Sequence, residues 1–242
     1  DEISGGRAFL GLGAGGSRSL VPMQISRNRP LLACRESAEI ARLLWQGSAV
    51  NYNGQMFQLQ DAQIGFTCRP DIQIHWAARG PKMLVLGGEI ADVNILHAIP
   101  RFALGNVVKK VTEGSNRSGR PLDMKYSIML VYDDESRQVA RKRTVYRLVD
   151  SPPDVRAGLG LKEDQVSEMR RLVTTHGPAA AAHLVDDEIL DHYVYKGDPK
   201  VCADELRALF SEYGFKGLTI EVPDPTNAES LLSYASEILN QI

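Results

Sequence analysis

Short apolar runs alternate with helix-length segments along most of the chain, and this alternation restricts the fold more than any other feature. The apolar runs predict five buried strands, at residues 8–13, 71–77, 92–96, 124–132 and 217–222. Helices are predicted between them, at residues 34–46, 81–88, 101–113, 135–149 and 199–213. Parallel strands require long crossover connections, and such helices supply them. The sequence therefore predicts an α/β protein with a parallel sheet.

Three further segments complete the predicted organisation. Residues 49–59 are typical of a β-hairpin, because an Asn-Gly pair lies between two strand-like runs. Residues 150–192 are predicted to be wholly helical or looped, and we interpret them as a helical insertion between two βα units. The last helix is predicted to begin with a capping box made by Thr226 and Glu229. No linker is evident, so we predict one domain over residues 1–242.

The composition excludes several classes of protein. A formal net charge of −2 over 242 residues gives no electrostatic reason to expect nucleic acid or an anionic membrane as partner. The three cysteines are widely spaced, so neither a disulfide framework nor a zinc ribbon is indicated. No apolar run approaches the length of a membrane span. We therefore expect a cytoplasmic protein that binds neither nucleic acid nor a membrane.

The stretch AFLGLGAGG, residues 8–16, contains the G-x-G-x-x-G spacing of dinucleotide-binding turns. In such turns the third glycine opens a helix, whose free N–H groups bind the pyrophosphate. Here Pro22 and Pro30 fall within the span of that helix, so we reject the dinucleotide interpretation. What remains is a strand whose end lacks side chains, which lets a flat or bulky group approach the backbone. An ordinary glycine turn without a ligand is the alternative.

The stretch HWAARGPKML, residues 75–84, ends a second strand in a similar way. Pro81 is placed at the first position of a helix, which leaves the N–H groups of Lys82 and Met83 without helical acceptors. Arg79 and Lys82 add positive charge to the positive end of the helix dipole. The segment predicts an anion site, and phosphate is the usual occupant of such a site. A solvated pair of basic side chains at an ordinary helix start is the alternative.

Other polar residues carry weaker signals. His97 follows the third predicted strand and is a candidate catalytic residue, with a packing role as the alternative. The acidic and histidine-bearing segment 183–192 matches no familiar metal signature, and we predict no metal site. The basic run from Arg141 to Arg147 follows several acidic residues, and we interpret it as charge that complements a helix dipole.

Four stretches carry a likeness to a known family: SGGRAFLGLGAG (4–15), VNYNGQMFQLQDAQI (50–64), AARGPKMLVLGGEIADVNIL (77–96) and residues 194–222. Together they resemble the bacterial luciferase-like monooxygenase superfamily, and within it the coenzyme F420-dependent, methylenetetrahydromethanopterin reductase-like branch. The third stretch is the most specific of the four. The resemblance covers nearly the whole chain.

The resemblance implies a (β/α)8 TIM barrel that binds a flavin or deazaflavin at the carboxyl ends of its strands. Residues beside the ring would be Gly13, Ala14 and Gly15. Residues at the phosphate would be Ala78, Arg79, Gly80, Pro81 and Lys82. The expected activity is hydride transfer between coenzyme F420 and a small organic substrate, by an enzyme that forms a homo-oligomer.

The resemblance begins at what should be the fourth strand of the barrel, and five strands cannot close it. We therefore expect three βα units, with residues of the catalytic site, to lie outside this sequence. Two other functions remain open: an FMN-dependent monooxygenase of the same superfamily, and a non-catalytic flavin-binding or interaction protein. The phosphate contacts do not decide between the coenzymes, because FMN also carries a phosphate.

Overall fold

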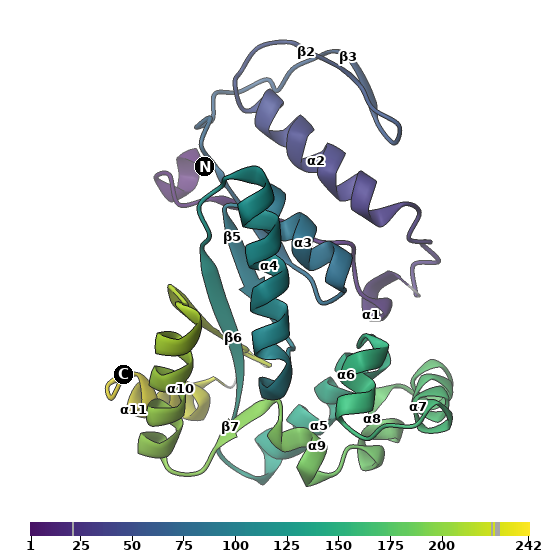
Figure 1. Cartoon of the computed structure of the whole chain (residues 1–242), viewed down its shortest axis with the longest axis vertical. Helices are drawn as coiled ribbons and strands as arrows, with labels where there is room; N and C mark the ends of the chain where they lie inside the picture. Colours follow the sequence, from purple (N-terminus) through teal and green to yellow (C-terminus); the bar gives the residue numbers. More distant parts are fainter. Residues whose placement is uncertain (21, 224, 226–227) are drawn as a thin grey trace. The chain divides into compact units, whose positions relative to one another are not determined.

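The computed structural model describes residues 1–20, 22–223, 225 and 228–242. These residues form two compact units, whose elements are labelled in Figure 1. The first unit contains Asp1–Ile95 and Lys109–Asp123, and the second contains Leu96–Val108 and Met124–Ile242. The single domain expected from the sequence stays a prediction.

The first unit is built on three parallel strands: β1 (Phe9–Leu12), β4 (Gln73–Ala77) and β5 (Val93–Leu96). In the pairing of β1 with β4, Leu12 lies opposite Trp76. In the pairing of β4 with β5, His75 lies opposite Val93. The three strands predicted in this part of the sequence are confirmed.

The first unit also contains helices. They are η1 (Glu2–Ser4), α1 (Ser17–Leu20), α2 (Pro30–Leu44), α3 (Pro81–Ile90) and the second half of α4 (Leu104–Ser118). Residues of α2 and α3 share a core with Ile74 and Trp76 of β4, both of which are almost fully buried. The predicted start of α2 at residue 34 is wrong by four residues, because Pro30 occupies the first helical position, where its missing N–H is not needed.

Two glycines let α3 and α4 approach closely within the first unit. A Cβ atom on Gly88 would overlap the carbonyl oxygen of Val111, and one on Gly114 would overlap the carbonyl oxygen of Val85. Each glycine therefore lies where the backbone of the other helix takes the place of a side chain. This crossing holds the two helices at a spacing that larger residues would not permit.

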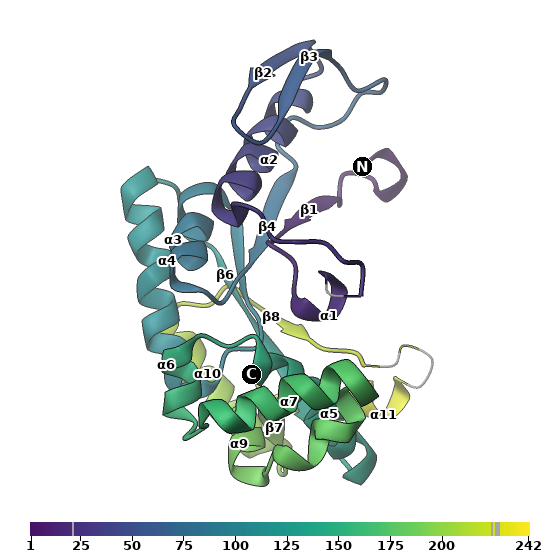
Figure 2. The same cartoon turned by 90° about the vertical axis from the view of Figure 1, so that its right-hand side faces the viewer.

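The predicted hairpin is confirmed as β2 (Val50–Asn53) and β3 (Gln58–Ala62), which pair antiparallel beside α2 (Figure 2). The buried carboxylate of Glu36 on α2 accepts three N–H groups of the turn, from Gln55, Met56 and Phe57, at 2.8, 3.0 and 2.9 Å. Burial acts to raise the pKa of Glu36, but these three N–H donors together lower it. The hairpin is thus fastened to α2 by one ionised side chain.

The second unit has its own parallel strands: β6 (Met124–Val131), β7 (Val194–Lys196) and β8 (Gly217–Ile220). Strand β6 pairs with both others, so that Leu130 lies opposite Tyr195 and Ser127 lies opposite Thr219. Strand β7 corrects the predicted total of five strands, because the described residues contain six that pair in parallel. The three residues of β7 are too few to show the alternation of apolar and polar side chains that predicts a strand. Strand β7 forms because β6 provides the edge to which it hydrogen-bonds.

The helices of the second unit follow the sequence closely. They are η2 (Arg101–Ala103), the first part of α4, α5 (Asp134–Val149), α6 (Pro153–Gly158), α7 (Glu163–His176), α8 (Pro178–Ala181), η3 (Ala182–Leu184), α9 (Asp187–Asp191), α10 (Pro199–Tyr213) and α11 (Glu229–Leu239). Elements α6 to α9, labelled in Figures 1 and 2, confirm that residues 150–192 are helical or looped. Residues of α7, α8 and α9 share a core with α5. The predicted capping residue Thr226 lies outside the described residues. That residues 150–192 are an insertion stays a prediction.

The observed architecture is an α/β fold with parallel strands, as predicted. Closure of these strands into a (β/α)8 barrel stays a prediction, as do the three expected additional units. None of the helices in the described ranges is both long enough and apolar enough to cross a membrane.

Candidate functional site

The two segments predicted to bind a ligand follow neighbouring strands of the first unit. Because β1 and β4 are parallel, with Leu12 opposite Trp76, the loops after them begin at the same edge of the sheet. A Cβ atom on Gly13 would lie 3.0 Å from the carbonyl oxygen of Ala77, so a side chain there would press against the end of β4. The structure therefore brings the glycine strand end and the Ala-Arg-Gly-Pro-Lys segment together. Sequence spacing alone did not establish this.

The glycine loop itself lacks the helix of a dinucleotide-binding turn. Gly15 has a φ of +75°, a conformation that favours glycine. The helix that follows, α1, is a single turn that ends at Leu20. Gly13 and Gly15 are exposed, and Ala14 packs partly against the core of the unit. The short α1 agrees with the rejection of the dinucleotide interpretation, and a ligand at the exposed backbone after β1 stays a prediction.

Among the described residues, the N-terminus of α3 has backbone N–H groups that no helical or side-chain acceptor binds. The first helical hydrogen bond runs from the N–H of Leu84 to the carbonyl oxygen of Gly80, at 2.9 Å. In the described part of the chain, the N–H groups of Lys82 and Met83 find no acceptor, and no side chain caps them. A Cβ atom on Gly80 would meet nothing within 4 Å, so the space before the helix is open. The indole of Trp76 donates to the carbonyl oxygen of Met83 at 3.0 Å and holds this first turn against β4.

Helix α10 offers an internal comparison, because it also begins with proline followed by lysine. There the side chain of Asp198 accepts the N–H of Lys200 at 2.7 Å, so the helix supplies its own anion. Helix α3 has glycine instead of aspartate before its proline. Its first turn therefore has no side-chain acceptor of its own within the described ranges.

His97 follows β5 and belongs to the second unit. Its Nδ1 lies 3.1 Å from Oγ of Ser127 and 3.6 Å from Oε1 of Glu221. Its side chain is 47% exposed, whereas that of Glu221 is 8% exposed. An accessible imidazole backed by a buried carboxylate is an arrangement that can hold and exchange a proton.

Two arginines of α5 hold Glu221 from the other side. Arg147 is buried and forms an ion pair with Oε1 of Glu221, and Arg143 contacts Oε2 at 3.2 Å. Arg141 instead pairs with Asp187 of α9 at 2.8 Å. The interpretation of this basic run as charge that complements a helix dipole is therefore incomplete, because its members bind particular partners. The sequence signal for Glu221 was a carboxylate within an otherwise apolar predicted strand.

The acidic segment before β7 has structural roles. Asp186 caps α9 by accepting the N–H of Ile189 at 2.8 Å, and Asp187 pairs with Arg141. In the ranges that the structure describes, no three metal-binding side chains come together in a group that could hold an ion.

Comparison with known proteins places these features in a family. The sequence model of the Luciferase-like monooxygenase family matches residues 1–217. A 5,10-methylenetetrahydromethanopterin reductase of Archaeoglobus fulgidus is 32% identical over 254 aligned positions, which cover 100% of this chain and 76% of the relative. An F420-dependent glucose-6-phosphate dehydrogenase of Nakamurella multipartita is 23% identical, over 98% of this chain and 68% of its own length.

Solved structures agree at the level of the fold. The coenzyme F420-dependent tetrahydromethanopterin reductase of Methanopyrus kandleri superposes with a TM-score of 0.83 at 22% identity, over 98% of this chain and 75% of that one. The chain spans 66–76% of the length of the first three curated reductases that it matches. The family match over most of the chain, together with the identity to the Archaeoglobus reductase, establishes that this chain belongs to the luciferase-like monooxygenase family.

Proposed function

We propose that this protein is an oxidoreductase that transfers a hydride between coenzyme F420 and a small organic substrate. The observation that carries the proposal is the uncapped N-terminus of α3, which lies at the same sheet edge as the glycine-rich end of β1. The whole of this chain aligns at 32% identity with 76% of a reductase. The Nakamurella relative and the Methanopyrus reductase are both F420-dependent enzymes. The higher identity to the Archaeoglobus enzyme favours the reductase branch over the sugar-phosphate dehydrogenases.

The residues of the first unit fit the phosphate end of such a coenzyme. Two backbone N–H groups of α3, the Arg79 guanidinium and the Lys82 ammonium supply donors and positive charge. The exposed backbone at Gly13, Ala14 and Gly15 would lie beside the ring. The bound deazaflavin would supply the hydride chemistry, and the protein would position it and exclude water.

In the second unit, His97 is the proposed acid–base residue. Ser127 and Glu221 approach Nδ1 and would fix the orientation of the ring. Arg143 and Arg147 keep Glu221 in place. Glu221 and the two arginines would therefore be positioning residues rather than catalytic ones. His97 would exchange a proton with the substrate through its imidazole.

Coenzyme titration tests the proposal. The protein should quench the fluorescence of coenzyme F420 with micromolar or tighter affinity and should bind FMN weakly. Tight binding of FMN with oxygen-dependent turnover would instead establish the monooxygenase alternative. Binding of either coenzyme without turnover of any tested substrate would favour the non-catalytic alternative. The cytoplasmic location and the homo-oligomer both stay predictions. Size-exclusion chromatography with light scattering would test the oligomeric state.

The anion site has a matched pair of variants. Charge-assisted phosphate contacts contribute about 1.5–3 kcal/mol each, so the double variant Arg79→Ala/Lys82→Ala should weaken coenzyme binding by at least about tenfold. Lys200→Ala is the control, because Lys200 stands at the same place in α10, whose first turn is already capped. Unchanged affinity in the double variant would refute the anion site.

A further inference from the structure

The loop between β5 and η2 carries His97, and its backbone is strained directly after that residue. Ala98 has a φ of +57°, in the left-handed region that alanine rarely adopts. Its side chain is buried. A residue in this conformation persists only where the surrounding structure holds it. The direction of the His97 side chain therefore depends on the contacts that hold this turn.

Arg101, three residues beyond Ala98, supplies such contacts. Its main-chain N–H donates to the carbonyl oxygen of His192 at 3.0 Å. Its guanidinium donates to the carbonyl oxygen of Val194 at 2.7 Å and to that of Asp191. One residue thus fastens the loop after β5 to the segment that joins α9 to β7.

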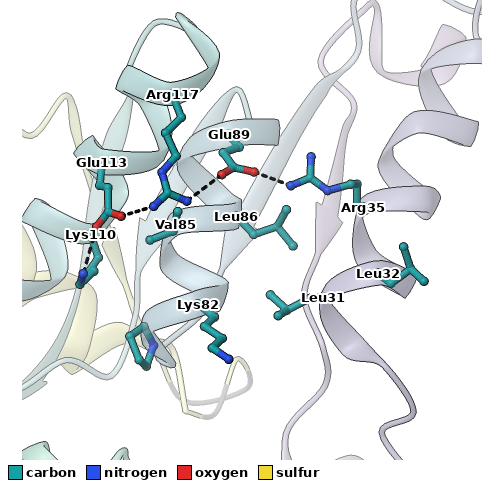
Figure 3. Close-up of a pocket in the computed structure, with 11 residues that line it drawn as sticks. Leu31, Leu32, Arg35, Lys82, Val85, Leu86, Glu89, Lys110, Glu113 and Arg117 are labelled. Carbon is teal, nitrogen blue, oxygen red and sulfur yellow. Dashed lines mark hydrogen bonds and ion pairs between the residues drawn. The ribbon is translucent and has the colours of Figure 1, made fainter.

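Local preferences do not explain an arginine at this position. Arg101 stands at the N-terminal end of the helical run formed by η2 and α4, where the helix dipole disfavours positive charge. Other arginines of the chain pair with carboxylates, as Arg35 and Arg117 do with Glu89 (Figure 3). Arg101 instead donates to main-chain oxygens, one of which ends α9, where a cation complements the dipole. Its tertiary contacts therefore account for its place.

The guanidinium also has a fixed orientation. It lies over the ring of Tyr195, with its central carbon 5.0 Å from the ring centre, and this ring is buried. Its two hydrogen bonds use different nitrogens of the planar group. A side chain held on its face and along its edge keeps one position, and so does the loop to which it belongs.

The next residue, Phe102, connects the same loop to α6. Its ring meets the ring of His192 edge-on, with 5.1 Å between the ring centres. A Cβ atom on Gly158 would lie 2.6 Å from the Phe102 ring, so this ring packs against the backbone of α6. Element η2 therefore contacts both the beginning and the end of the helical residues 150–192. The loop that carries His97 is coupled to that segment.

We propose that Arg101 is a positioning residue for His97. By binding the carbonyl oxygens at the end of α9, it holds the turn at Ala98 in its left-handed form. This turn directs the His97 imidazole to Ser127 and Glu221, whose oxygen atoms lie 3.1 and 3.6 Å from Nδ1. The catalytic consequence rests on the proposed acid–base role of His97, whereas the control of its orientation rests on these contacts alone.

Steady-state kinetics of Arg101→Met test the catalytic consequence. Methionine keeps much of the side-chain volume and removes both donors. A misplacement of about 1 Å can cost about 10²-fold in rate, so kcat should fall by about tenfold to hundredfold. Affinity for coenzyme F420 should not change, because the residues proposed to bind it belong to the first unit. Arg101→Lys keeps the charge without the planar fork, and it should recover only part of kcat.

Arg207→Met is the matched control. Arg207 of α10 also donates to a main-chain oxygen in the second unit, that of Gln241 at 2.8 Å. This variant should leave kcat unchanged, since the bond that it removes lies outside the loop after β5. Equal losses of kcat in the Arg101 and Arg207 variants would overturn the proposal.

A double variant separates positioning from general structural support. In the His97→Asn background, Arg101→Met should lower kcat by less than about threefold, because no imidazole remains to be positioned. A loss as large as that in the wild-type background would show that Arg101 acts independently of His97, and would overturn the proposal.

A second substitution tests whether Arg101 acts through the strained turn. Glycine adopts a φ of +57° without the steric cost that alanine has there. Adding Ala98→Gly to Arg101→Met should therefore raise kcat by about threefold to tenfold. No recovery would refute this route of action.

Nuclear magnetic resonance of protein with ¹⁵N-labelled histidine reports on His97 without coenzyme. Its ring signals are identified by their loss in His97→Asn. Arg101→Met should shift them at constant pH, whereas Arg207→Met should not. Thermal unfolding of each variant checks that it is folded, and Arg101→Lys takes the place of Arg101→Met in every comparison should the latter not fold.

The two measurements distinguish this proposal from the proposed function. If the ring signals shift as expected but the protein does not react with coenzyme F420, the positioning role stands and the proposed function fails. If the protein is active and Arg101→Met changes neither kcat nor the ring signals, the positioning role alone fails.

Discussion

Replacing Arg147 with methionine would leave the carboxylate of Glu221 buried beside a side chain that cannot pair with it. The side chains of Arg147 and Glu221 are only 7% and 8% exposed, so water cannot compensate for the lost partner. Removing one member of a buried ion pair costs about 3–5 kcal/mol. The cost here should be about 3 kcal/mol, because Arg143 and His97 still contact Glu221 at 3.2 and 3.6 Å.

The converse substitution should cost at least as much. Glu221→Met would leave the buried Arg147 without its carboxylate, although the guanidinium still lies 5.7 Å from the centre of the Tyr193 ring. The double variant Arg147→Met/Glu221→Met removes both charges, and apolar replacement of a whole buried pair is often neutral or stabilising. We therefore expect the double variant to be more stable than either single variant.

Urea unfolding at neutral pH measures these free energies, and a double-mutant cycle gives the coupling. Arg171→Met is the control, because its pair with Glu168 is exposed and should contribute little. Losses that simply add in the double variant, or a loss for Arg147→Met as small as that for Arg171→Met, would refute the view that this pair is a buried and interdependent unit.

Three further perturbations test other parts of the molecule. Gly114→Ala would place a Cβ atom on the carbonyl oxygen of Val85, and it should destabilise the fold by about 1–3 kcal/mol in thermal unfolding, whereas Gly105→Ala, with its nearest atom at 3.5 Å, should not. Glu36 has a lowered pKa, so its contribution to stability is present above its ordinary value of 4.5 and is lost as the pH falls through the lower folded value. The protection factors of the hairpin amides, which correct for the intrinsic pH dependence of exchange, should therefore fall in acid, and Glu36→Gln should abolish that fall; an unchanged acid response in the variant would contradict the assignment. His97→Asn should lower kcat by about 10²–10⁴-fold with little change in coenzyme affinity, and full activity in this variant would exclude His97 as the acid–base residue.

Much of the fold could be predicted because its signals are local. Pro81, Pro199 and Gly214 stand at helix ends in the structure, where their backbone preferences place them. The β-hairpin follows from its Asn-Gly turn, and the helical nature of residues 150–192 follows from the lack of strand-like runs. The start of α2 at Pro30 was not predicted, because proline can either end a helix or occupy its first position.

The chemistry of the first candidate site was partly visible in the same way. The uncapped start of α3 could be predicted from the short stretch Ala78 to Lys82. In the structure the helix begins at Pro81, as predicted. That the bare end of β1 lies at the same sheet edge required the pairing of two strands far apart in the chain. Spacing along a sequence does not specify which strands become neighbours.

By itself, the sequence determined the α/β class and most element positions, and it predicted where an uncapped helix start would lie, because these depend on short-range periodicity and capping. Only the tertiary structure decided that β7 is a strand, since its three residues gain order from β6. Only the tertiary structure, likewise, buried Arg147 against a carboxylate that follows β8, and joined α2, α3 and α4 through ion pairs to Glu89. Burial and pairing of charges depend on contacts between distant residues, and no local pattern encodes them.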